Sequence, residues 1–102
     1  MLGSMDKDTV IAVLRSHQPE LQRLGVRHAA LFGSLARGEA GPNSDIDIAI
    51  ELDRSRQPTV YDYVGMQQFI SGLFEGTVDV VDREALKPRV RERVLADLVD
   101  AF

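Results

Sequence analysis

One alternating segment restricts the fold of this chain more than any other. Residues 44–50 read S-D-I-D-I-A-I. Such alternation predicts a β-strand, in which successive side chains leave opposite faces of the sheet. The carboxylates of Asp45 and Asp47 would then share one face, and the isoleucines would share the other. Because like charges disfavour each other's ionised form, we expect a positive group beside the two acids.

Length and composition indicate one folded domain. The chain has 102 residues, of which 44% are hydrophobic and 27% are charged. This is sufficient for one hydrophobic core and too short for two domains. We therefore expect a single domain over residues 1–102, in which residues 1–4 could be a vector-derived leader before a natural start at Met5.

The charge balance restricts the class of partner. With 12 basic and 16 acidic residues the formal charge is −4, which disfavours stable nucleic-acid binding because such binding needs a broad basic surface. The chain contains no cysteine, so it has neither a disulfide framework nor a thiolate metal site. No apolar run has the length of a membrane span or the form of a signal peptide. We expect a cytoplasmic protein without a membrane partner.

Helix and strand patterns alternate along the chain. Capping residues and helical spacing predict helices at 6–17, 19–24, 59–74 and 88–102, with Gly76 as the stop of the third. Strands are expected at 26–33, 45–52 and 77–82, with one helical turn and a loop after the first. The prediction is an α/β fold of the α+β kind, with a small mixed sheet of three to four strands covered by helices.

The two longer helices are expected to differ in their exposed faces. In 59–74, a broad apolar stripe that includes Val60 and Val64 should pack on the sheet. The expected apolar face of 88–102 comprises Val90, Val94, Leu95, Leu98, Val99 and Phe102. Its basic side, with Arg89, Arg91 and Arg93, is interpreted as a solvated face, and an acidic partner surface is the alternative.

Three aspartates can meet on one face of the sheet. Asp79 alternates with valines in the predicted strand 77–82, so it would share a face with Asp45 and Asp47 if the strands are neighbours, whereas Asp82 would face the other way. Carboxylates that converge in this way suit Mg²⁺. Two such ions, about 3.5–4 Å apart, would hold the attacking and leaving oxygens of a phosphoryl transfer. The alternative is a solvated strand face.

A Gly-Ser turn precedes the acidic strand. A glycine such as Gly33 at the end of a strand lets backbone N–H groups approach an anion, and the following helical turn adds its positive dipole end. The Ser34 hydroxyl can donate a further hydrogen bond to a phosphate oxygen. Strand, Gly-Ser turn, loop and acidic strand, in this order, indicate a site where a phosphate meets a metal ion.

Two further residues of the loop are candidates for this site. The guanidinium of Arg37 matches a phosphate in geometry, and the alternative is a role in stabilising the fold or plain exposure to solvent. Ser44 would either orient the acidic strand or serve only in the turn.

The segment GSLARGEAGPNSDIDIAIELD (33–53) resembles the signature of the DNA polymerase β-type nucleotidyltransferase superfamily. Its spelling and the short chain resemble the minimal nucleotidyltransferases, or MNT proteins. The segment TVDVVDREALKPRVRERVL (77–95) resembles the third-carboxylate strand and closing helix of that family. The resemblance spans about residues 30–95 and implies the polymerase β-type nucleotidyltransferase fold.

The resemblance also implies roles for individual residues. Gly33 and Ser34 would hold the nucleotide phosphates, with Arg37 and Ser44 as further nucleotide-binding candidates. Asp45 and Asp47 would bind Mg²⁺. Asp79 would be the third catalytic carboxylate, joining the metal site and helping to activate the acceptor. Larger relatives have a further domain that grips the base or the acceptor, and because this chain lacks one we expect a partner protein to complete the site.

MNT proteins occur in two-gene modules with a HEPN ribonuclease toxin. In these modules the MNT protein is the antitoxin and transfers AMP from ATP to a tyrosine of the toxin. The resemblance therefore implies a protein adenylyltransferase that acts as the antitoxin of a type VII-like module, with ATP as substrate and a HEPN toxin as partner. The alternative is a non-catalytic antitoxin that neutralises its partner by steric binding, although a pure binder has no need of three clustered acids.

Overall fold

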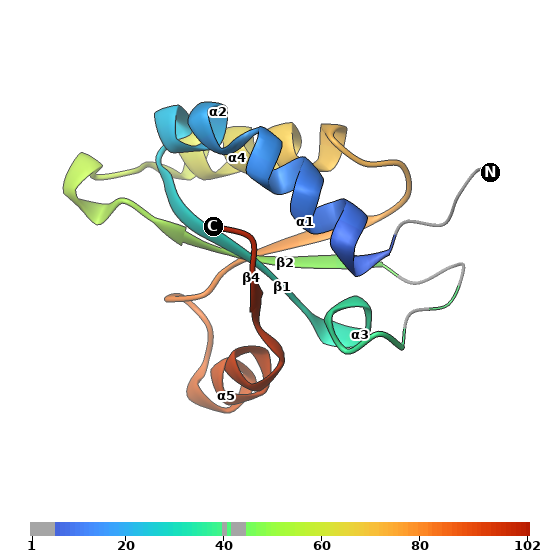
Figure 1. Ribbon diagram of the computed structural model, residues 1–102. Coiled ribbons are helices and arrows are strands. Elements are labelled where there is room, and N and C mark those ends of the chain that lie inside the picture. Colours follow the sequence, from blue (N-terminus) through green and yellow to red (C-terminus); the bar gives the residue numbers. More distant parts are fainter. Residues whose placement is uncertain (1–5, 40, 42–44) are drawn as a thin grey trace.

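The computed structural model describes residues 6–39, 41 and 45–102, which form a four-stranded sheet with helices on both faces (Figure 1). The expectations for Met1–Met5 and for Ser44 lie outside the described residues. Within the described ranges, no helix is long and apolar enough to cross a membrane.

The elements follow the expected order, with one addition at the end. The helices are α1 (Lys7–Ser16), α2 (Gln18–Leu24), α3 (Gly33–Ala36), α4 (Val60–Gly72) and α5 (Pro88–Asp97), with a 3₁₀ turn η1 (Arg54–Arg56). The strands are β1 (Val26–Phe32), β2 (Ile46–Leu52), β3 (Val78–Asp82) and β4 (Val99–Asp100). The predicted α/β class is confirmed.

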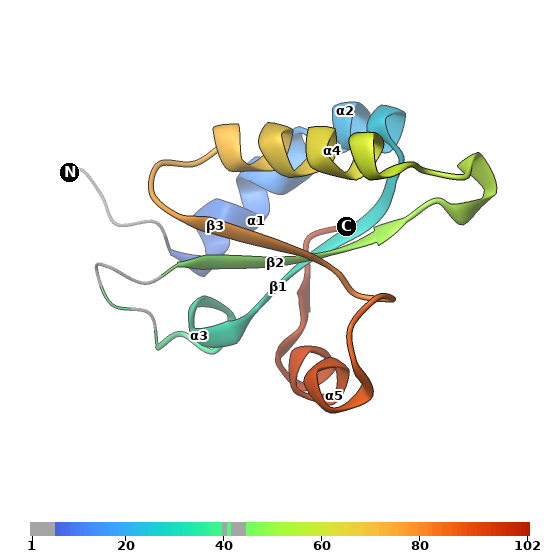
Figure 2. The ribbon, with the colours of Figure 1, turned by 180° about the vertical axis from the view of Figure 1, so that it is seen from behind.

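The sheet has the strand order β3-β2-β1-β4 and is mixed. β1 runs antiparallel to β2 and to β4, whereas β2 and β3 are parallel. A parallel pair needs a crossover connection, and α4 provides it. Figures 1 and 2 show α1, α2 and α4 on one face of the sheet and α3 and α5 on the other.

The alternation in β2 determines which face of the sheet is covered. Ile46, Ile48 and Ile50 are buried in the main hydrophobic core, together with residues of α1, α2 and α4. Asp47 is half-buried on the opposite face, and Asp45 is exposed immediately before the strand. The prediction of opposite faces is confirmed for Asp47 and the isoleucines, whereas Asp45 lies outside β2.

The prediction of a helix that continues to residue 102 is wrong. α5 ends at Asp97, and Leu98 has extended backbone angles (φ −61°, ψ 131°). The chain then forms β4, which pairs Asp100 with Ala30 and Val99 with Leu31. Pairing with the open edge of β1 replaces the last helical turn, because backbone groups of β1 would otherwise lack sheet partners.

The expected apolar faces of the two longer helices are only partly correct. In α5, Val94 is buried whereas Val90 is 45% exposed. In α4, Val60 is 75% exposed, and burial is concentrated further along, at Met66 and Ile70. Helical spacing identifies a face, but it does not tell which turns of the helix lie over the sheet.

The end of α4 also differs from the prediction. The helix ends at Gly72, and Gly76 lies beyond it in the turn before β3, with φ +88°. The glycine is therefore a turn residue and does not terminate the helix.

Candidate active site

The Gly-Ser turn and the acidic strand are in direct contact. β1 ends at Phe32, and α3 begins at Gly33 with φ +76°, a conformation that favours glycine. A Cβ atom on Gly33 would lie against Oδ2 of Asp47 and 3.1 Å from its Cγ. Glycine is thus required here because the carboxylate of Asp47 packs against its Cα.

The three aspartates lie at one end of the sheet. Asp47 and Asp79 are directly opposite in the parallel pair of β2 and β3, where neighbouring strands are about 4.8 Å apart. Asp45 precedes β2 by one residue and is exposed. This register confirms that Asp79 shares a face with Asp47.

Burial and the neighbouring acids oppose the ionisation of Asp47. The pKa of Asp47 is raised above its ordinary value by burial first, and then by the negative charges of Asp79 and Asp45. The positive charge of Arg37 lowers the same pKa. The fold therefore holds carboxylates at a cost in free energy that a bound cation would offset.

The donor set fits one type of metal site. Carboxylate oxygens suit Mg²⁺, which takes one or two protein carboxylates and completes its shell with water and phosphate oxygens. In the part of the chain that the structure describes, no group of three or more His, Cys, Asp or Glu side chains is arranged to hold a metal ion. An ion held by these carboxylates would need water or phosphate oxygens to complete its shell.

Arg37 lies at the end of α3 and reaches across to α5. Its Nη1 donates to Oδ2 of Asp97 at 2.6 Å, and its Nε donates to Oε1 of Glu39 at 3.0 Å. Both contacts raise the pKa of the guanidinium. These ion pairs agree with the fold-stabilising alternative, and phosphate binding by Arg37 stays a prediction.

The other residues considered from the sequence lie in different places. Ser34 is half-buried in the first turn of α3, whereas Ser44 is outside the described residues. Asp82 lies on the other face, where its Oδ2 accepts a hydrogen bond from Arg54 at 2.5 Å. Its exclusion from the acid cluster is confirmed.

Two cavities lie away from the aspartates. One, of about 430 Å³, is lined by residues of β2, β3, η1 and the start of α4, among them Val60 and Tyr63, and by Pro58 between η1 and α4. The other, of about 330 Å³, lies beside Val26 and His28. Neither lining includes Asp45, Asp47 or Asp79.

Comparison with known proteins agrees with this arrangement. The family model for the nucleotidyltransferase domain matches residues 14–100. The chain belongs to the nucleotidyltransferase family. Over 99 residues it is 31% identical to protein adenylyltransferase MntA of Thermococcus cleftensis, covering 96% of this chain and 98% of the relative. The family resemblance of the sequence is thereby confirmed, and the protein is an enzyme that acts on nucleotides.

Solved structures of nucleotidyltransferases share the fold. A structure provisionally described as a minimal nucleotidyltransferase has 34% identity and a TM-score of 0.77, covering 95% of this chain and 98% of that one. A toxin–antitoxin structure with AMP-PNP has 22% identity and a TM-score of 0.66, covering 96% and 73%. A structure of tri-AMPylated Shewanella oneidensis HEPN toxin with MNT antitoxin has 17% identity and a TM-score of 0.62, covering 90% and 71%. At these lower identities, the two toxin–antitoxin structures show that they share the fold of this chain.

Sequence reasoning missed one contact of this nucleotidyltransferase. Asp97 was not among the candidates, although it forms the shortest ion pair of Arg37. The two residues are 60 positions apart, and nothing in the local pattern around either one indicates the other.

Proposed function

We propose that this nucleotidyltransferase transfers AMP from ATP to a hydroxyl group of a partner protein. The partner would be a HEPN toxin, the acceptor a tyrosine, and the transfer would make this chain the antitoxin of a type VII-like module. The decisive observation is the contact between the Gly33 turn and Asp47, with Asp79 alongside in register. Identity to MntA over almost the whole of both chains supports the same function.

The residues of the site divide into two groups. Backbone N–H groups at Gly33 and Ser34 would bind the nucleotide phosphates, assisted by the Ser34 hydroxyl and the Arg37 guanidinium. Asp45, Asp47 and Asp79 would hold Mg²⁺, which, when bound, offsets the charge of the phosphates and of the carboxylates alike.

The reaction exchanges the phosphoanhydride bond of ATP for a phosphate ester bond to the acceptor. The acceptor oxygen forms a bond to the α-phosphorus of ATP, the bond from that phosphorus to the β-phosphate oxygen breaks, and pyrophosphate leaves. The proton of the acceptor hydroxyl passes to a carboxylate, for which we propose Asp79. Asp79 is exposed beside the half-buried Asp47, so an incoming hydroxyl can reach it.

A partner protein would complete the site. The three acids lie at the open end of the sheet and are not part of either cavity described above. A toxin docked over them would supply the acceptor and exclude water, which limits wasteful hydrolysis of the nucleotide. A structure with the same fold contains a tri-AMPylated HEPN toxin in complex with MNT antitoxin, which supports a HEPN protein as the acceptor.

The test combines this chain with the product of its neighbouring gene, which we propose to be a HEPN toxin, and with ATP and Mg²⁺. We expect mass spectrometry to find one or more AMP groups on a toxin tyrosine, and the wild type to relieve toxicity in cells. Asp45→Asn/Asp47→Asn should abolish both effects. Asp82→Asn is the matched control, because Asp82 lies on the other face of the sheet and should not affect transfer.

Two outcomes would contradict the proposal. If the double variant neutralises the toxin as well as the wild type and no mass is added, steric binding is the function. If mass is added to a small molecule but not to the toxin, the acceptor is not a protein.

A further inference from the structure

Arg37 connects the nucleotide turn to a distant helix. Its backbone N–H donates to the carbonyl of Gly33 at 3.2 Å and closes the single turn of α3. Its side chain extends to Asp97, the last residue of α5, with an N···O distance of 2.6 Å. One residue thus joins the turn at the end of β1 to the end of α5.

The two acidic partners of Arg37 are not equivalent. The Asp97 side chain is 24% exposed, whereas that of Glu39 is 64% exposed. Glu39 is also only two residues away in the chain. Asp97 is the less exposed partner, makes the shorter contact and belongs to a different element, so it is the partner that can fix the guanidinium relative to the rest of the fold.

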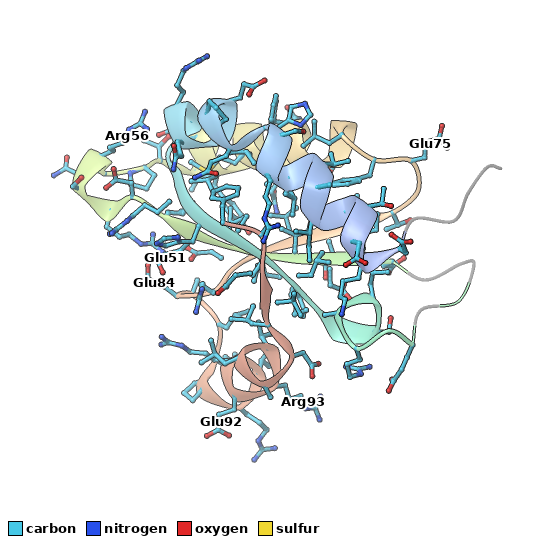
Figure 3. All side chains as sticks on the ribbon, viewed as in Figure 1. Glu51, Arg56, Glu75, Glu84, Glu92 and Arg93 are labelled. Atoms are coloured by element: carbon cyan, nitrogen blue, oxygen red, sulfur yellow. The ribbon has the colours of Figure 1, made fainter. Side chains whose placement is uncertain are left out.

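Asp97 is unfavourably placed for the helix to which it belongs. The C-terminal end of a helix bears partial negative charge, so a base is favoured there and an acid is not. The last turn of α5 contains no base. Figure 3 shows Glu92 and Arg93 of the same helix projecting away from the sheet. Asp97 instead accepts a hydrogen bond from Arg37, at the end of α3. The ion pair with Arg37 offsets the unfavourable position of this acid at the helix end.

The guanidinium retains hydrogen-bonding capacity beyond its two ion pairs. Its charge acts on Asp47, so it lies within electrostatic reach of the acid cluster. The two ion pairs use Nε and one N–H of Nη1, which leaves the other donors of the fork for a ligand. The groups that remain, one N–H of Nη1 and both N–H groups of Nη2, can donate to phosphate oxygens.

We infer that Asp97 is a positioning residue for nucleotide binding, which holds the Arg37 guanidinium where its remaining N–H groups meet the phosphates of ATP. The inference rests on the proposed function, because it assumes that the turn binds ATP. It adds a residue of the C-terminal helix to the set that determines nucleotide affinity.

The test is a double-mutant cycle on the affinity for Mg-ATP, measured by titration calorimetry with this chain alone. Arg37→Ala and Asp97→Asn should each weaken binding, Asp97→Asn by about tenfold or less, since it removes one charge-assisted contact indirectly. In the Arg37→Ala background, Asp97→Asn should have no further effect. Asp97→Glu should restore most of the affinity, because it keeps the ion pair.

Asp100→Asn is the control for the loss of one negative charge near the end of α5, since Asp100 is exposed on β4. It should leave the affinity unchanged. Thermal unfolding of each variant identifies any effect that comes from a damaged fold, and the cycle is evaluated at a temperature where all variants are folded.

The outcomes separate this inference from the proposed function. If Asp97→Asn lowers the unfolding temperature but not the affinity, or weakens binding equally with and without Arg37, Asp97 has only a structural role and the inference is wrong. If the wild type itself does not bind Mg-ATP, the proposed function fails and the inference fails with it.

Discussion

At the scale of single residues, two constraints favour glycine at position 33. Its backbone has a positive φ, and the carboxylate of Asp47 occupies the space where a side chain would begin. The sequence predicts that this glycine allows a phosphate to approach the backbone. The structure shows a second reason for glycine that does not depend on a ligand: the turn packs directly against the carboxylate of Asp47.

Gly33→Ala should therefore damage the site more than an ordinary strained substitution. We expect it to abolish detectable Mg-ATP binding and to lower the free energy of unfolding by roughly 2–4 kcal/mol, from backbone strain and the displacement of Asp47. Gly38→Ala is the control, since Gly38 also has positive φ (+75°) but no atom within 4 Å of a new Cβ. It should cost only about 1–2 kcal/mol and keep ATP binding. Urea unfolding and calorimetry decide, and equal loss of affinity in both variants would contradict the argument.

Asp47 should make the stability of the metal-free protein depend on pH. A carboxyl whose pKa is higher in the folded state destabilises the fold as it ionises, so the cost grows as pH rises from the ordinary value of 3.8 through the raised pKa. Asp47→Asn should then gain stability relative to the wild type as pH increases across this range. Urea unfolding in a chelating buffer, at about pH 3.5 and pH 7, measures the difference.

Asp53 provides a control of opposite sign. Its pKa is lowered by hydrogen bonds from Ser55, so its contribution to stability is present above 3.8 and is lost as pH falls through the lowered pKa. Asp53→Asn should lose stability relative to the wild type at neutral pH and approach it in acid. A gain for Asp47→Asn that is the same at both pH values would show that charge is not the cause.

At the scale of elements, α5 is a helix with little core of its own. Val94 is its one buried residue, and Val90 and Leu95 are largely exposed. The helix is held by this valine, by the Arg37–Asp97 ion pair and by the strand that follows it. Its basic residues Arg89, Arg91 and Arg93 are exposed, in agreement with the interpretation of a solvated face.

Val94→Ala should accordingly destabilise the protein far more than Val90→Ala. Removing two buried methyl groups costs about 2 kcal/mol, whereas the same change at an exposed site costs about 0.5 kcal/mol or less. Chemical unfolding of the two variants gives the comparison within one helix. Equal values would mean that α5 does not pack on the sheet as described.

At the scale of the whole molecule, the sheet depends on residues from both halves of the chain. β1 lies between β2 and the C-terminal strand β4. The C-terminus is also held by its neighbours, because Ala101 is 3% exposed and its carbonyl accepts a hydrogen bond from Nε of Arg15 at 2.6 Å. The last residues of the described chain are therefore part of the fold.

Deletion of residues 99–102 should lower the free energy of unfolding by about 3 kcal/mol or more, through lost strand hydrogen bonds and lost burial of Ala101 and Phe102. It should also open the edge of β1 and promote association of the chain. Asp100→Ala is the control, since it keeps the backbone pairing. Unfolding and sedimentation measurements test both effects, and a stable, monomeric truncated chain would contradict them.

Periodicity and turn chemistry determined much of this protein from the sequence alone. The alternation around Asp45 and Asp47 predicted a strand and its two faces, and the Gly-Ser turn before it predicted the position of the candidate site. Asp79 was assigned to the same face by alternation, because a strand repeats every two residues wherever it lies. These are local rules, and each needs only a few neighbouring residues.

The tertiary structure alone decided what depends on distant segments. Whether residues 99–100 continue a helix or form a strand depended on the open edge of β1, and whether Val60 is buried depended on what lies beneath α4. The pairing of Arg37 with Asp97 depended on the position of α5 against α3. Burial and long-range ion pairs arise from how elements pack, and the free energy of packing is not encoded in the period of any one segment.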